Sequence, residues 1–301
     1  MSRQCVAAIG SIDAELADTI VRFETPAAAV EARACLLLIR AADWVRFRAQ
    51  TPADSVCALI ADSLEREECG QYLADPRVRH VLHRGPALTD ALAQTAGIAN
   101  GSRAAAPSAL DLGESSFDES LRSSEQEPSL LRNAKQFAER FGAKGRAAQN
   151  WLDALSEAVT NAMYNAPRDG EDAPFKSLHR NRVVLLPASK AIKVSLFATP
   201  SQVAFSVTDP FGSLTATQFQ GALSRTLGSP LARPVDSAGG AGLGLMMMFD
   251  RLERLVAMVV PGHETTIVGI GALTHRGGAR RGRTVQFFQR DVDSAGPAIR
   301  P

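Results

Sequence analysis

One helix is predicted for the stretch Trp151-Leu-Asp-Ala-Leu-Ser-Glu-Ala-Val-Thr-Asn-Ala-Met-Tyr-Asn-Ala166. Its polar residues Glu157, Asn161 and Asn165 are spaced four apart, so they share one helix face about one turn from each other. Apolar side chains surround this row. A carboxylate followed by two amides is a donor set for a metal ion and a water molecule. For this pattern taken alone, the alternative is a set of solvated or satisfied helix residues.

Two later segments supply partners for this row. The first is Ala204-Phe-Ser-Val-Thr-Asp-Pro-Phe-Gly-Ser-Leu214, an apolar strand that leads into Asp209 and a glycine turn. The second is Gly239-Gly-Ala-Gly-Leu-Gly-Leu245, which opens directly into a long apolar pattern typical of a helix. Exposed backbone amides at the start of a helix suit an anion such as phosphate.

Together, and in this order, the three segments resemble the ATP-binding domain of the superfamily that contains gyrase, heat-shock chaperones, histidine kinases and mismatch-repair proteins (GHKL). The segment Ser156-Glu-Ala-Val-Thr-Asn-Ala162 is most similar to the version found in bacterial anti-sigma-factor serine kinases. The resemblance covers residues 145–290, about half of the chain. It implies an α+β sandwich in which an antiparallel or mixed sheet is backed by helices.

The resemblance also implies ATP and Mg²⁺ as cofactors and a role for each site residue. Asn161 would be the metal ligand, Glu157 the catalytic general base, and Asn165 a residue that helps to hold waters at the phosphates. Asp209 would accept a hydrogen bond from the adenine amine, and Thr265 in Gly262-His-Glu-Thr-Thr266 would complete the nucleotide site. The remaining cofactor-binding residues implied by the resemblance are Gly212, Gly240, Gly242, Leu243 and Gly244.

The turn after Asp209 departs from the pattern of the family, which is Asp-x-Gly-x-Gly. Phe211 stands at the first glycine place, and Gly212 comes one residue late. A ring at this place would either pack on the base or narrow the pocket. The alternative for Asp209 is a strand-end turn closed by its own side chain.

Residues 1–95 are predicted to form an α/β domain with a parallel sheet. Short apolar runs separated by helical patterns are typical of buried parallel strands; the runs are Cys5–Ile9, Thr19–Phe23, Cys35–Ile39, Val56–Ile60 and Val78–Leu82. Five such units resemble a response-regulator receiver. The strand ends lack its chemistry, since the third run leads to Arg40 and the fifth to His83-Arg84. We therefore expect a degenerate receiver-like domain that serves partner binding or self-association.

Residues 96–128 are rich in Ala, Ser, Gly, Pro and acidic side chains and are predicted to be a flexible linker. The ATP-binding domain is expected at 129–290, and a frayed tail at 291–301. The first helix predicted in the ATP-binding domain, Ser129–Phe141, contains no His to accept a phosphoryl group, which disfavours an orthodox sensor histidine kinase. The further predicted elements are helices at 146–166, 215–227 and 243–257 and strands at Val183–Leu186, Ile192–Phe197, Val203–Val207, Ile267–Leu273 and Thr284–Phe288.

The composition sets the remaining expectations. Thirty-three basic and 32 acidic residues give a formal net charge of +1, so the overall charge does not point to nucleic acid. No apolar run has the length of a membrane helix and no signal pattern opens the chain, which favours a cytoplasmic protein. We expect an ATP-binding signalling protein that phosphorylates or sequesters a protein partner. The alternative is a non-catalytic module whose partner binding is gated by nucleotide; a homodimer is compatible with either.

Overall fold

The computed structural model describes residues 6–9, 21–23, 25–31, 36–62, 66–85, 87–99, 106–113, 115–168, 174–175, 177–179, 182–227, 243–273 and 283–290. Its strands are β1 (Val6–Ile9), β2 (Val21–Phe23), β3 (Leu36–Arg40), β4 (Cys57–Ala61), β5 (Val78–His83), β6 (Ser115–Leu121), β7 (Ile192–Ala198), β8 (Gln202–Asp209), β9 (Arg254–Val260), β10 (Glu264–Ala272) and β11 (Thr284–Gln289). Its α-helices are α1 (Pro26–Glu31), α2 (Ala41–Phe47), α3 (Arg66–Leu73), α4 (Leu88–Ala99), α5 (Glu127–Arg140), α6 (Gly145–Thr160), α7 (Ala216–Leu227) and α8 (Leu243–Arg251). None of these helices combines the length and the apolar character needed to cross a lipid bilayer.

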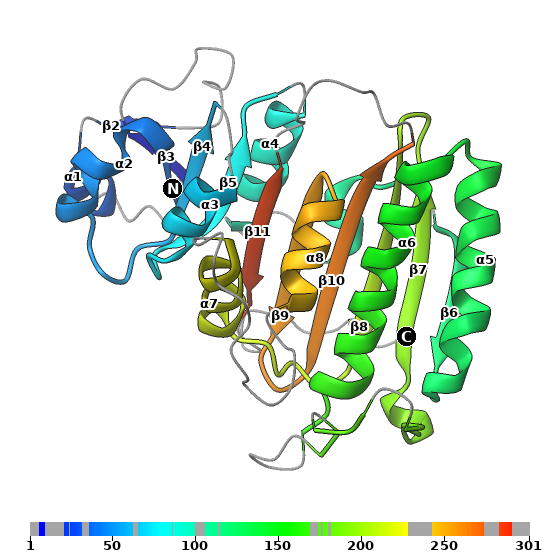
Figure 1. Cartoon of the computed structure of the whole chain (residues 1–301). Coiled ribbons are helices and arrows are strands. Elements are labelled where there is room, and N and C mark those ends of the chain that lie inside the picture. The colour runs from blue at the N-terminus through cyan, green and yellow to red at the C-terminus, as the bar shows by residue number, and fades with distance from the viewer. Residues whose placement is uncertain are drawn as a thin grey trace, which may run out of the picture.

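All of the strands belong to one mixed sheet, in the order β2-β1-β3-β4-β5-β11-β9-β10-β8-β7-β6 (Figure 1). The strands β1 to β5 are parallel to one another and alternate with helices, as the apolar runs predict. Every residue of β4 is buried, which explains why its sequence is a continuous apolar run. The order 2-1-3-4-5 is one of the two common doubly wound arrangements.

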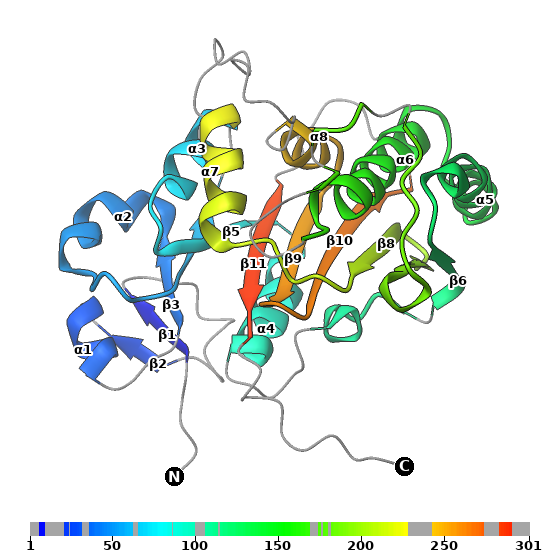
Figure 2. The same cartoon turned by 90° about the horizontal axis from the view of Figure 1, so that it is seen from below.

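The other six strands form the second half of the sheet. Neighbours in this half are antiparallel, except that β11 runs parallel to β9. The strands predicted from Ile192, Val203, Ile267 and Thr284 are all present. Helices α5, α6, α8 and α7 lie side by side over one face of this half (Figure 2).

The two halves join where β11 pairs with β5, in an antiparallel register that sets Val285 opposite Val81 and Gln286 opposite His80. A buried polar network strengthens this junction. The Arg254 side chain donates to Gln286 and to Gln94, each at 2.6 Å, and the Gln286 amide donates to the Thr95 hydroxyl at 2.6 Å. Residues far apart in the sequence are thereby fixed to one another inside the protein.

Helix α7 also ties the halves together, because it packs along α3 (Figure 2). The buried Gln220 amide donates to the carbonyl of Val78 at 2.8 Å and lies 3.4 Å from the carbonyls of Asp75 and Pro76. The helix after α7 is also held: Arg66 of α3 forms an ion pair with Asp250 of α8 at 3.8 Å. Both helices that flank the glycine segment are therefore held by the N-terminal half.

The prediction of a flexible linker at 96–128 was wrong for much of that range. Ser115–Leu121 form β6, the edge strand that pairs with β7, and the 3₁₀ turn Pro107–Leu110 packs on the sheet face opposite α6. Leu110 and Leu112 are buried there against Val256 and Val268. Two leucines in a polar segment are enough to hold it on an already formed apolar face.

Two predicted elements were also wrong. In place of a strand at Val183–Leu186, only Leu185 forms a bridge, with Ser123. The predicted helix 243–257 ends at Arg251, and residues from Arg254 form β9, whose central residues are all buried. A short apolar run fits a buried strand as well as a helix, so the pattern alone did not fix this boundary. The predicted tail 291–301 lies outside the described residues.

The shared sheet predicts that both halves unfold in one transition. Trp44 and Trp151, the two tryptophans of the chain, are buried on opposite sides of the junction. Each of the single variants Trp44→Phe and Trp151→Phe leaves one fluorescent reporter. In each variant, the urea midpoint reported by the remaining tryptophan should coincide with the midpoint that circular dichroism gives for the same variant. Clearly separated midpoints would contradict one cooperative unit.

Candidate functional site

The site is built on the C-terminal part of α6. Trp151, Leu155, Ala158 and Val159 bury one side of this helix on the sheet and so fix its rotation. After Thr160 the chain makes a π-helical turn, Asn161–Asn165, in which the Ala166 amide donates to the Asn161 carbonyl at 2.9 Å. The predicted single α-helix therefore ends in a wider turn. Such turns often occur at functional sites, because they redirect side chains without ending the helix.

Two of the predicted residues face the first turn of α8. A Cβ atom added at Gly244 would lie 2.7 Å from the Glu157 carboxylate oxygen Oε2 and 3.2 Å from the Asn161 amide nitrogen Nδ2. A side chain at position 244 would therefore displace the Glu157 carboxylate from this place. The structure brings the carboxylate and the amide together at the N-terminus of a helix, as the sequence predicts.

Asn165 is joined to this group by a hydrogen bond. Its Nδ2 donates to Oδ1 of Asn161 at 2.7 Å. The π-helical turn changes the four-residue spacing on which the predicted polar row rested, yet the two amides remain in contact. Asn161 and Asn165 are both partly exposed, so both can be reached from outside the core.

Asp209 and Thr265 form the other end of the site. Asp209 is the last residue of β8, and the register of β8 with β10 places it directly opposite Thr265. Both are buried, with exposed fractions of 5% and 3%. The Thr265 hydroxyl has no hydrogen-bond partner within the described part of the chain, although buried polar atoms are normally paired.

Burial also governs the charge of Asp209. Desolvation raises the pKa of its carboxyl from 3.8 to about 7, against the opposing effect of hydrogen bonds from the backbone of Phe211 and Gly212. The Phe211 amide donates to Oδ1 at 3.0 Å. The side chain of Asp209 therefore closes the turn that follows it, as the alternative interpretation of the sequence expects. The carboxyl nevertheless remains buried, with a pKa near neutral pH.

Gly212 shapes the turn after Asp209. Its φ angle is 58°, and a Cβ atom there would lie 2.3 Å from the Val260 carbonyl oxygen in the β9–β10 hairpin. Glycine is thus required by both conformation and space. The Phe211 ring packs beneath the Lys190 ammonium, 5.4 Å from the ring centroid. Ser213 then donates to the Ala166 carbonyl at 2.9 Å, which fixes this turn to the end of the π-helical turn.

The glycine segment is described only in part. Gly240 and Gly242 lie outside the described residues. Leu243 begins α8 and has a largely exposed side chain, and Gly244 follows it against Glu157 and Asn161.

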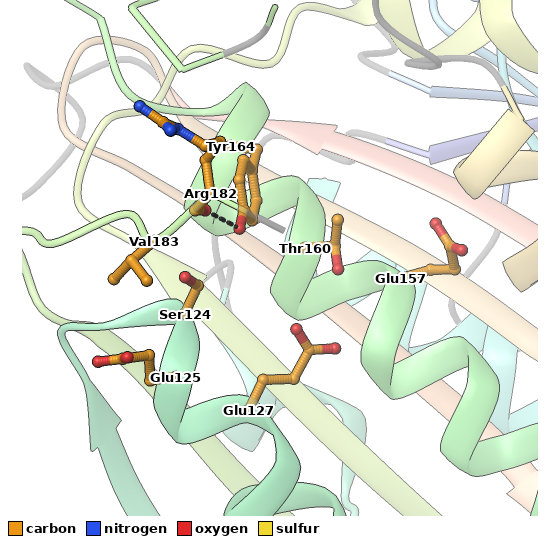
Figure 3. Close-up of a pocket in the computed structure, with 8 residues that line it drawn as sticks. All are labelled: Ser124, Glu125, Glu127, Glu157, Thr160, Tyr164, Arg182 and Val183. Carbon is orange, nitrogen blue, oxygen red and sulfur yellow. Dashed lines mark hydrogen bonds between the residues drawn. The ribbon is translucent and has the colours of Figure 1, made fainter. Parts of the chain in front are cut away.

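The sequence did not predict a cleft of about 410 Å³ between the start of α5 and the last turns of α6 (Figure 3). It is lined by Ser124, Glu125, Glu127, Glu157, Thr160, Tyr164, Arg182 and Val183. A capping box starts the 3₁₀ turn Ser124–Gln126, which leads directly into α5: the Gln126 side chain accepts from the Ser123 amide at 2.9 Å, and the Glu125 amide donates to the Ser123 hydroxyl at 3.2 Å. This Ser-x-x-Gln pattern was the available signal.

Comparison with known proteins adds no relative of the chain. No protein-family model matches it, and neither does any curated protein. The function must therefore be inferred from the geometry and chemistry of the site.

We predict that Asp209→Asn stabilises the ligand-free protein above neutral pH. A carboxyl whose pKa rises from 3.8 to about 7 on folding favours the folded state when protonated. The free energy of unfolding of the native sequence should therefore fall between those two values, by about 1.4 kcal/mol for each pH unit. Asn keeps the acceptor for the Phe211 amide but cannot ionise.

Urea unfolding at pH 5 and pH 8 measures this effect. The difference in stability between Asp209→Asn and the native sequence should grow from the lower to the higher pH. Asp54→Asn, at an exposed position, is the control and should show no such growth. A constant difference for Asp209→Asn would contradict burial of an ionising carboxyl.

Proposed function

We propose that this protein binds ATP with magnesium through a GHKL-type domain and transfers the γ-phosphoryl group to a hydroxyl of a protein partner. The observation that carries this proposal is the contact of Gly244 with both Glu157 and Asn161. It brings a carboxylate, a side-chain amide and the backbone amides of a helix N-terminus to one place, and these groups suit the roles of base, metal ligand and phosphate site. Phosphoryl transfer needs positioning and electrostatic stabilisation of this kind.

The adenine end is supported by Asp209 and Thr265. An ionised carboxylate accepts a hydrogen bond from the exocyclic amine of adenine, and the unpartnered hydroxyl of Thr265 next to it gains a partner when a base enters. The same carboxylate has no donor for the oxygen of guanine. Selectivity for adenine follows from this arrangement when Asp209 is ionised.

At the first turn of α8, away from the proposed adenine end, the amide of Asn161 suits magnesium. Within the described residues, no group of three or more His, Cys, Asp or Glu side chains could hold a metal ion. Magnesium is suited to such a place, because it usually takes few protein ligands and completes its shell with phosphate oxygens and water. Asn161 would hold the ion through its neutral amide oxygen. When bound, the ion would neutralise charge on the triphosphate.

Glu157 distinguishes transfer from simple binding. Its carboxylate lies at the first turn of α8 and also borders the open cleft, so it can take a proton from a hydroxyl that approaches the phosphates. A second candidate function is a non-catalytic module whose partner binding is gated by nucleotide. The departure of the turn after Asp209 from the family pattern, with Phe211 at the first glycine place, favours this candidate.

For the N-terminal half we propose a degenerate receiver-like domain that does not accept phosphate. At the carboxyl ends of β3, β4 and β5 lie Arg40, Asp62 and Arg84, and Asp62 pairs with Arg84 at 2.9 Å and with Arg40 at 3.6 Å. A basic residue occupies the strand end where a receiver carries its phosphoacceptor. The contacts of α3 with α7 and α8 instead support a role in holding the ATP-binding half.

We predict opposite effects of Thr265→Val on stability and on binding. Valine has the same shape and removes a buried hydroxyl without a partner, so the ligand-free protein should be as stable as before or more stable. Affinity for ATP should fall, and Asp209→Asn should weaken it by on the order of 1.5–3 kcal/mol through loss of a charge-assisted hydrogen bond.

Calorimetric titration with MgATP and thermal unfolding measure the two properties. Thr208→Val is the matched control, because Thr208 bonds Thr266 at 2.8 Å. It should lower stability and leave ATP affinity unchanged. The GHKL site is excluded if the native chain shows no adenine-nucleotide binding at millimolar concentration.

A further pair of variants separates the kinase from the module. Asn161→Ala should abolish the magnesium dependence of ATP binding. Glu157→Gln should keep binding but lose about 10²–10⁴ in the rate of phosphoryl transfer, because the amide cannot take up the proton. Transfer of label from γ-labelled ATP to a co-purified partner is the measurement. Native protein that binds ATP yet never transfers or hydrolyses it would leave the gated module as the function.

A further inference from the structure

The cleft between α5 and α6 lies beside the proposed base. Glu157 is shared: it lines the cleft, and its carboxylate also faces Gly244 at the start of α8. Helix α6 lies between α5 on one side and α8 on the other (Figure 2). Glu157 therefore lies at the border between the cleft and the first turn of α8.

The lining of the cleft is acidic. Glu127 at the start of α5, Glu125 in the 3₁₀ turn before it and Glu157 of α6 all line the cleft; the carboxylate of Glu127 lies between those of Glu125 and Glu157, which point in opposite directions (Figure 3). The guanidinium of Arg182, at the opposite rim, is directed away from them (Figure 3). Because the chain as a whole has a net charge of only +1, this negative potential is local. It favours a cationic occupant and repels a nucleotide or a nucleic acid.

One part of the rim of the cleft is apolar and firmly held. Val183 lines the cleft with 55% of its surface exposed, and Leu185, two residues further on, is 66% exposed. The segment that carries them is fixed by hydrogen bonds: the Tyr164 hydroxyl donates to the Arg182 carbonyl, and the Val184 amide to the Ser124 hydroxyl. Large apolar side chains that a rigid frame presents to solvent mark an interaction surface.

We propose that this cleft receives the phosphoacceptor segment of the partner, with a Ser or Thr hydroxyl next to a Lys or Arg and an apolar residue. The inference rests on the proposed function and adds the class of substrate to it. Glu125 and Glu127 take the basic side chain, Val183 and Leu185 the apolar one, and the hydroxyl is directed to Glu157. A small polar metabolite would leave the apolar rim unused.

The proposed reaction moves the γ-phosphoryl group from ATP to this hydroxyl. The hydroxyl oxygen attacks the γ-phosphorus of ATP, so an O–P bond forms while the bond from phosphorus to the β,γ-bridging oxygen breaks. The electron pair of that bond leaves with ADP. The hydroxyl proton passes to the carboxylate of Glu157 and then to solvent.

The test uses the full chain and fluorescein-labelled peptides without nucleotide. One peptide has a central Ser flanked by Arg and Leu; a second has Glu in place of Arg, and a third has Ala in place of Leu. At about 0.15 M salt, fluorescence anisotropy should show binding of the first peptide about tenfold tighter than binding of the second. Glu125→Lys should abolish or reverse this preference, and Leu185→Ser should remove the difference between the first and third peptides.

Glu139→Lys is the matched control, because Glu139 lies on α5 away from the cleft and is 52% exposed. It should keep the preference of the native chain. Equal binding of the basic and acidic peptides, or an unchanged preference in Glu125→Lys, would overturn the proposal. Since these measurements need no ATP, they fail independently of the ATP-binding titrations that test the proposed function.

Discussion

The pairing of β5 with β11 is the contact on which the arrangement depends. It inserts the last strand of the chain between β5 and β9 and turns two groups of strands into one hydrogen-bonded sheet. Arg254 and Gln286 sit behind it in a network that reaches α4. Desolvation lowers the pKa of the buried Arg254 to about 10, so the guanidinium is still charged at neutral pH, and the amide oxygens of Gln286 and Gln94 accept hydrogen bonds from it.

This constraint extends to the candidate site. Because the sheet is continuous, α3 lies where it can pack on α7, and Gln220 binds the carbonyl of Val78 at the start of β5. Asp75, which is held by Arg77 and Arg48, keeps that loop in place. Residues of the N-terminal half thus add to the packing that positions α7 and α8. The N-terminal half therefore has a structural role in the arrangement of the candidate site.

The sequence predicts what depends on local pattern. Apolar runs located β1 to β5, and alternation located β7 and β8, because burial on two faces or one leaves a direct trace in the residues. The joining of the halves left no such trace, since it pairs Val81 with Val285 across most of the chain. Leu110 and Leu112 are similar: their burial depends on a face made by other strands, so a composition rule called their segment flexible.

The candidate site divides in the same way. Glu157, Asn161, Asp209, Gly244 and Thr265 were found because each lies in a short ordered motif, and strand register and helix packing then bring them together in the two predicted groups. The cleft was missed because residues near 125 and near 183 meet only in the folded chain, through contacts such as the hydrogen bonds of Ser124 with Val184. In the function that we propose, short motifs carry the chemistry that acts on phosphate. Recognition of the group that would receive the phosphate depends on surfaces that only the folded chain assembles, and in this proposal Glu157 is the residue that belongs to both.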